Sequence, residues 1–103
     1  MDAAAPTFAA ASFDVVLARH VVWALPDPGD ALRRWLSLLR PGGRLVLIEG
    51  RWQTDRGCLG LEAAALDVLL RDRARSVAVE PLPDPNLWGR VVEDERYVLV
   101  ARR

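Results

Sequence analysis

Polar side chains follow two apolar runs of this chain, and their types could support chemistry. Arg19 and His20 come directly after the run FDVVLA, and Glu49 ends the run RLVLIE. An imidazole at such a position could act as a base or as a hydrogen-bonding group. The carboxylate, small residue and indole in Glu49-Gly50-Arg51-Trp52, together with Trp23, could form a rim that faces a bound molecule.

Structural roles offer an alternative for the same side chains. Arg19 could pair with a surface carboxylate, and His20 could cap a turn. Glu49 and Arg51 could form a solvated ion pair, which contributes little to stability. Tryptophan is often buried for its apolar area alone. Which role applies depends on the elements that position these residues.

Two apolar strands around an amphipathic helix would place these side chains. The run Phe13–Ala18 is short, valine-rich and nearly continuous in apolar residues, which is typical of a strand buried in a parallel sheet. Asp27 followed by Pro28 predicts a helix start, with the aspartate as N-cap. Pro41-Gly42-Gly43 predicts the end of that helix, and Arg44–Glu49 predicts the second strand. The two strands should lie parallel in a right-handed βαβ unit. The expected buried stripe of the helix comprises Leu32, Trp35, Leu36 and Leu39.

The remainder of the chain predicts a second helix and two more strands. Gly50–Gly57 reads as a loop, and Val77 and Val79 alternate with less apolar residues, as in a strand. A proline-rich loop, PLPDPN, and a polar turn precede a last strand at Tyr97–Ala101. Because no long helix separates these two strands, they can pair antiparallel. The second helix is expected to bury Leu59, Ala63, Leu66 and Leu70.

Length and composition indicate one small globular domain over residues 1–103. Hydrophobic residues make up 51% of the chain, and 14 basic residues balance 14 acidic ones. This balance does not favour nucleic acid or an anionic membrane as a partner. Cys58 is the single cysteine, so neither an intrachain disulfide nor a cysteine-cluster metal site is expected. No signal peptide or spanning segment is apparent, and we expect a cytoplasmic protein without a metal.

The chain resembles the carboxyl-terminal half of a class I, Rossmann-like S-adenosylmethionine-dependent methyltransferase of the methyltransferase type 11 kind. The resemblance covers residues 2–103, and it is carried by the words SFDVV, LPDP, LLRPGGRLVLIE and WGRVVEDERYVLVARR in this order. It implies a partial α/β sheet with a last strand inserted antiparallel. It also implies S-adenosylmethionine as cofactor and an unidentified, small-molecule acceptor.

The resemblance assigns roles to residues at the carboxyl edge of the sheet, where open α/β folds bind their ligands. Asp2 matches an acidic residue that accepts a hydrogen bond from the adenine amino group, and Ala3 supplies an amide near the ring. Ala18 and Arg19 lie where the family contacts the methionine part of the cofactor. His20 is the candidate catalytic base. The candidate acceptor-binding residues are Trp23, Glu49, Arg51 and Trp52.

The chain departs from the family pattern because it has no glycine-rich cofactor loop after an apolar strand. Without that loop we expect little or no cofactor binding by the chain alone, so whether it is an active enzyme stays open. The strand at Phe13–Ala18 would also become an exposed apolar edge, which favours association with another chain. Three hypotheses follow. The chain is a methyltransferase fragment, a noncatalytic module that dimerises or complements a separate N-terminal half, or another nucleotide-binding α/β enzyme, which the missing dinucleotide loop disfavours.

Overall fold

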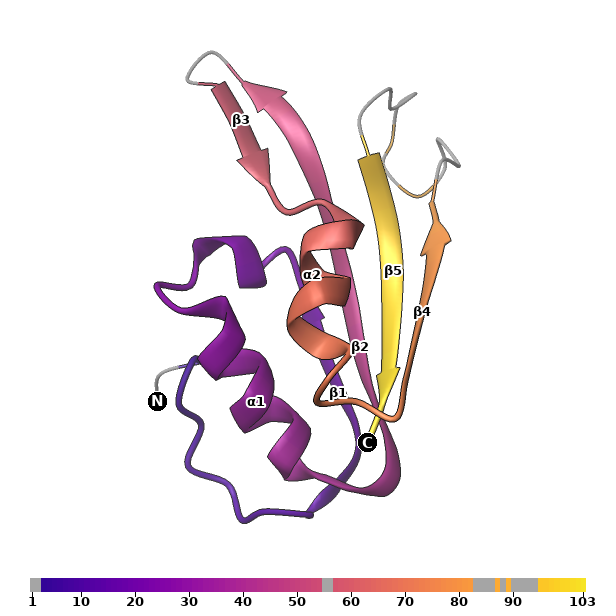
Figure 1. Cartoon of the computed structure of the whole chain (residues 1–103). Helices are drawn as coiled ribbons and strands as arrows, with labels where there is room; N and C mark the ends of the chain where they lie inside the picture. The colour runs from indigo at the N-terminus through magenta and orange to yellow at the C-terminus, as the bar shows by residue number, and fades with distance from the viewer. Residues whose placement is uncertain (1–2, 55–56, 83–86, 88, 90–94) are drawn as a thin grey trace.

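A mixed sheet with two helices on one of its faces makes up the described part of the chain (Figure 1). The computed structural model describes residues 3–54, 57–82, 87, 89 and 95–103. The strand order is β1-β2-β5-β4, and β3 pairs with the outer part of β2. The strands are β1 (Phe13–Arg19), β2 (Leu39–Thr54), β3 (Gly57–Gly60), β4 (Ser76–Pro81) and β5 (Glu95–Arg102). The helices are α1 (Pro28–Leu38), α2 (Ala63–Leu70) and the short 3-10 helix η1 (Val22–Ala24).

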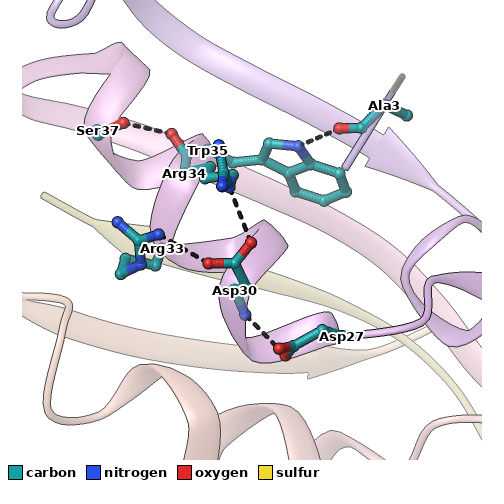
Figure 2. A network of polar contacts seen from close by, with 7 residues as sticks. All are labelled: Ala3, Asp27, Asp30, Arg33, Arg34, Trp35 and Ser37. Atoms are coloured by element: carbon teal, nitrogen blue, oxygen red, sulfur yellow. Dashed lines mark hydrogen bonds and ion pairs between the residues drawn. The ribbon is translucent and has the colours of Figure 1, made fainter. Parts of the chain in front are cut away.

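The predicted βαβ unit is confirmed. Strands β1 and β2 are parallel, with Leu17 opposite Val46, and α1 connects them. Asp27 caps α1, because its side chain accepts a hydrogen bond from the Asp30 amide at 3.1 Å, and Pro28 is the first helical residue (Figure 2). The carboxyl end of β1 and the start of α1 therefore lie at the same edge of the sheet.

The end of α1 differs from the prediction. The helix stops at Leu38, and Leu39 is already extended, with φ −81° and ψ 143°. Leu39 is still buried, although it packs as a strand residue and not as part of the helical stripe. The Pro41-Gly42-Gly43 segment belongs to the start of β2. The residue before a proline is disfavoured in the helical region, so the chain must leave the helix ahead of Pro41.

The last strand lies inside the sheet, between β2 and β4. It is antiparallel to both neighbours, with Leu99 opposite Leu47 on β2 and opposite Val79 on β4. The predicted antiparallel pairing of the two final strands is confirmed. Pro81, the first residue of the expected proline-rich loop, belongs instead to β4, where it lies opposite Tyr97. Residues 83–86 of that loop and the Glu93-Asp94 part of the expected turn lie outside the described residues.

The prediction of a loop at Gly50–Gly57 is wrong. Strand β2 continues to Thr54 and pairs antiparallel with β3. Leu59 consequently belongs to β3 and not to the second helix, which begins at Ala63. The hairpin ends at Gly60, whose φ of +98° favours glycine, and the Leu61 amide donates to the Gly50 carbonyl at 3.0 Å.

The core lies on the helix-bearing face of the sheet. Residues of one parity on β2 and β5 are buried there against both helices, namely Leu45, Leu47, Glu49, Tyr97, Leu99 and Ala101. The residues of the other parity are only partly buried: Val46, Ile48, Val98 and Val100. Among the described strands β1 pairs with β2 alone, and its side chains Val15 and Leu17 are 44% and 64% exposed. The predicted apolar edge is present in these residues.

Candidate functional site

The turn after β1 has an unusual backbone conformation. His20 has φ 55°, in the left-handed region that few non-glycine residues adopt. Its amide donates to the Ile48 carbonyl at 2.9 Å, and its carbonyl accepts from the Trp23 indole at 3.1 Å. These two bonds fold the chain back against the carboxyl end of β2 and into η1. The turn therefore has a defined shape at the edge where a ligand is expected.

Glu49 lies beneath this turn and is buried, with none of its surface exposed. Its Oε1 atom accepts from the amides of Val21 at 3.1 Å and Val22 at 2.8 Å. Its Oε2 atom is also buried and has no hydrogen-bond partner among the described residues. Glu49 is thus neither on an exposed rim nor in a solvated pair with Arg51, because its parity on β2 points its side chain into the core.

Burial dominates the protonation of Glu49 and of its cross-strand neighbour Tyr97. Burial raises the pKa of Glu49, and the Val22 and Val21 amides oppose this only partly. Burial, followed by the nearby carboxylates of Glu49 and Glu95, raises the pKa of Tyr97. The Tyr97 hydroxyl donates to the Leu61 carbonyl at 2.7 Å. Both side chains are therefore stabilised in their uncharged forms.

We expect the raised pKa of Glu49 to make stability depend on pH. The folded chain disfavours the carboxylate, so its stability should decrease as pH rises from the ordinary glutamate pKa of 4.5 through the higher folded pKa. Glu49→Gln should remove this decrease. Urea unfolding at several pH values measures the difference in unfolding free energy between wild type and variant. A difference that stays constant across this range would contradict the assignment. His20 titrates in both proteins, so its contribution cancels.

The His20 side chain has the protonation state that a base requires. Burial, and then the positive charges of Arg19 and Arg96, lower the pKa of His20. The imidazole is consequently neutral at neutral pH, and neutral imidazole can accept a proton. The lowered pKa is compatible with the predicted role of His20 as a base.

An open hollow of about 490 Å³ runs beside β1 and contains three of the four candidate cofactor residues, Ala3, Ala18 and Arg19. The fourth, Asp2, lies outside the described residues. The Ala3 carbonyl accepts from the Trp35 indole at 2.8 Å, which ties the amino-terminal segment to α1 (Figure 2). Apolar residues of the segment, β1, the turn after β1 and α1 form the remaining wall: Pro6, Phe8, Phe13, Val15, Val16, Leu17, Val21, Trp35 and Leu38.

Apart from Glu49, two residues of the predicted acceptor rim have described side chains, Trp23 and Arg51. Trp23 is partly buried beside His20, whereas Arg51 is paired with Glu62. The side chain of Trp52 lies outside the described part of the chain. In that part no group of three His, Cys, Asp or Glu side chains could hold a metal ion. Its helices are also too short or too polar to span a membrane.

Comparison with known proteins identifies the fold. Residues 1–47 match the family model described as a methyltransferase domain. The whole chain aligns with 55% of the [4+2]-cyclase SpnF, with a TM-score of 0.78 and 18% identity. The chain carries a class I methyltransferase fold. In the same way, 97% of the chain aligns with 48% of the Burkholderia thailandensis 1,6-didemethyltoxoflavin-N1-methyltransferase, with a TM-score of 0.71 and 22% identity. That structure contains 1,6-didemethyltoxoflavin and S-adenosylhomocysteine.

A curated methyltransferase is also similar to part of the chain. The aklanonic acid methyltransferase DauC of a Streptomyces species is 47% identical over 46 residues, which are 45% of this chain and 21% of that protein. The chain spans about half the length of the two solved methyltransferase-fold structures above. The predicted resemblance to class I methyltransferases, and the predicted partial α/β sheet, are confirmed.

Sequence reasoning missed the contact between Glu49 and the turn after β1 in this methyltransferase fold. One signal was available, because Leu45, Leu47 and Glu49 alternate along a strand expected to be buried. A carboxylate with the parity of two core leucines needs hydrogen-bond donors inside the protein. The donors to Glu49 are the backbone amides of Val21 and Val22, and nothing in the sequence marks these two residues for this role.

Proposed function

We propose that this chain is a single-domain portion of an S-adenosylmethionine-dependent methyltransferase and forms one wall of its site. The observation that carries this proposal is the hollow beside β1, which gathers Ala3, Ala18 and Arg19 at the carboxyl edge of the sheet. The acceptor is a small molecule, in line with the compounds named for two relatives, aklanonic acid and 1,6-didemethyltoxoflavin.

The residues around the hollow fit the modest demands of methyl transfer. When bound, the donor supplies an electrophilic methyl group on a sulfonium whose leaving group is a neutral thioether. Catalysis can then depend on alignment and on a site with little water. The backbone of Ala18 and Arg19 would hold the methionine part, and Asp2 and Ala3 the adenine. His20 would accept a proton from the acceptor.

Trp23, Arg51 and Trp52 are proposed to lie around the acceptor. Glu49 is withdrawn from that set, because its buried side chain cannot contact a bound molecule directly. A carboxylate in its position acts on the protein backbone instead.

Titration of the isotopically labelled chain with S-adenosylhomocysteine tests the proposed function. We expect shifts of the backbone amides of Ala3, Ala18, Arg19 and His20, with Ala78 on β4 as an unaffected reference. Because these 103 residues contain no glycine-rich cofactor loop, the dissociation constant should be in the range of about 1 mM, which corresponds to about −4 kcal/mol. Shifts confined to other elements would contradict the site, and micromolar affinity would contradict the expected role of the loop.

A second candidate function is assembly through the β1 edge, either with another copy or with a separate N-terminal half. The observation that favours it is the exposure of Val15 and Leu17, at 44% and 64%, on a strand that pairs on one side only among the described strands.

We expect the chain to self-associate at high concentration and Leu17→Lys to weaken that association. A lysine on an edge strand discourages pairing with another strand. Val68→Lys is the matched control, because Val68 is 56% exposed but lies on α2. Sedimentation velocity over a concentration series provides the measurement. A wild-type chain that remains monomeric throughout, or equal effects of both substitutions, would count against edge assembly.

A further inference from the structure

The turn after β1 holds a strained residue that its surroundings must maintain. His20 is left-handed, and such strained conformations persist only where neighbouring contacts enforce them. The His20 amide and carbonyl are each hydrogen-bonded, to Ile48 and to the Trp23 indole. Both bonds act on His20 itself, so the residues that follow need a separate restraint to carry the chain into η1.

Glu49 supplies that restraint. The parallel pairing of β1 with β2 ends at Arg19 opposite Ile48, and the next amide, that of His20, still donates to Ile48. Beyond this point the backbone of β1 turns away from β2. The Glu49 side chain then accepts from the two following amides, so that it continues the contact between the strands by two more hydrogen bonds.

This contact, which we name the Glu49 bridge, consists of the bonds from the Val21 and Val22 amides to Glu49 Oε1. The bond from Val22 is buried, because Glu49 and Val22 have no exposed surface, whereas the bond from Val21 is partly buried. A buried amide that loses its acceptor is left unsatisfied, which destabilises the conformation that buries it. Glu49 is itself held in β2, opposite Tyr97 on β5.

We propose that Glu49 is a positioning residue, which fixes the turn after β1 so that Ala18, Arg19 and His20 present their backbone to the methyl donor. This inference rests on the proposed function. Ala18, Arg19 and Val21 line the hollow, and this segment is held by the β1–β2 pairing at Ala18 and Arg19 and by the Glu49 bridge at Val21. Losing the bridge would free the far end of that segment while the sheet stays paired.

Amide hydrogen exchange in three proteins measures the bridge without any ligand. Glu49→Gln keeps a side-chain oxygen acceptor, so Val21 and Val22 should exchange within about threefold of wild type. Glu49→Leu removes the acceptor at similar volume, and exchange of these two amides should accelerate about tenfold or more. Glu80→Leu is the matched control, because Glu80 is an exposed strand glutamate on β4. Unchanged exchange in a folded Glu49→Leu protein would overturn the proposal.

A wild-type measurement keeps the test decisive if Glu49→Leu does not fold. The amide proton shifts of Val21 and Val22 should follow the titration of the Glu49 carboxyl carbon, and Glu49→Gln should abolish this dependence. Tyr97, the titratable group opposite Glu49 on β5, is separated because its pKa is also raised, from an ordinary value of 10.0. His20, which precedes Val21, titrates in Glu49→Gln as well, so the dependence that this variant removes belongs to Glu49. Amide shifts that do not follow Glu49, or that persist unchanged in Glu49→Gln, would overturn the proposal.

Titration with S-adenosylhomocysteine then separates this inference from the proposed function. We expect the dissociation constant to rise about tenfold in Glu49→Leu and to be restored in Glu49→Gln, because the local loss of order weakens a preorganised site. Equal affinity in a folded Glu49→Leu protein would overturn the positioning role while the proposed function stands. The absence of shifts in every variant would contradict the proposed function, and with it the role of Glu49 in positioning the backbone for the methyl donor. The exchange experiment would still establish the Glu49 bridge.

Discussion

Leu47→Ala should lower the free energy of unfolding by about 3 kcal/mol, within the usual range for a buried leucine. Leu47 has no exposed surface and lies in the middle of β2, with Ala18 of β1 and Leu99 of β5 as its neighbours in the sheet. Truncation leaves a cavity where three strands meet. A domain of this size has about 5–15 kcal/mol of stability in total, so the loss should be obvious in urea unfolding.

Val79→Ala is the matched control for Leu47→Ala. Val79 lies opposite Leu99 on β4, and its side chain is 42% exposed. We expect this substitution to cost about 0.5 kcal/mol, because surface substitutions away from the core are usually small. Similar losses for the two variants would show that the burial of Leu47 is not the source of its effect.

Gly60→Ala should be the most damaging of the small substitutions. A Cβ atom at this position would lie 1.9 Å from the Gly50 carbonyl oxygen, and φ is +98°. The same carbonyl accepts the Leu61 amide, so it cannot move without breaking that bond. We expect a loss of at least about 3 kcal/mol, or separation of β3 from β2, because backbone strain alone costs about 1–3 kcal/mol.

Gly42→Ala distinguishes steric overlap from left-handed strain. Gly42 has φ +82°, but a Cβ atom there would have no heavy atom within 4 Å. Its substitution should cost about 1 kcal/mol, which is the penalty of a left-handed alanine alone. Thermal unfolding gives the ranking, and amide exchange of Gly60 and Leu61 shows whether the hairpin has opened. A Gly60→Ala protein as stable as Gly42→Ala would contradict the overlap.

The elements that sequence predicted correctly are those with strong local signals. The Asp27 side chain accepts from the Asp30 amide within the first turn of α1. The apolar runs of β1 and β2 are short and contain β-branched residues, which favours strands over helices. The position of Ala18, Arg19 and His20 at the carboxyl edge follows from the parallel pairing of those strands.

The features that sequence could not supply depend on distant partners. The β2–β3 hairpin requires a glycine at position 60, where φ is positive and the backbone packs closely against Gly50. The spacing of apolar residues in the sequence does not reveal this contact. The conformation of His20 is imposed by Ile48 and Trp23, and Glu49 is buried because two amides from another element reach it. Each case needs the three-dimensional arrangement before the residue's role is apparent.

The location of β5 between β2 and β4 has a consequence for biosynthesis. A ribosome releases β2 and β4 before the strand that must join them, and neither can complete its hydrogen bonds with the other. Until Glu95–Arg102 emerges, the nascent sheet therefore lacks the strand that pairs with both β2 and β4. Slow release of β5 would prolong the exposure of the unpaired edges of β2 and β4. We therefore expect chaperones to matter most at this stage of synthesis.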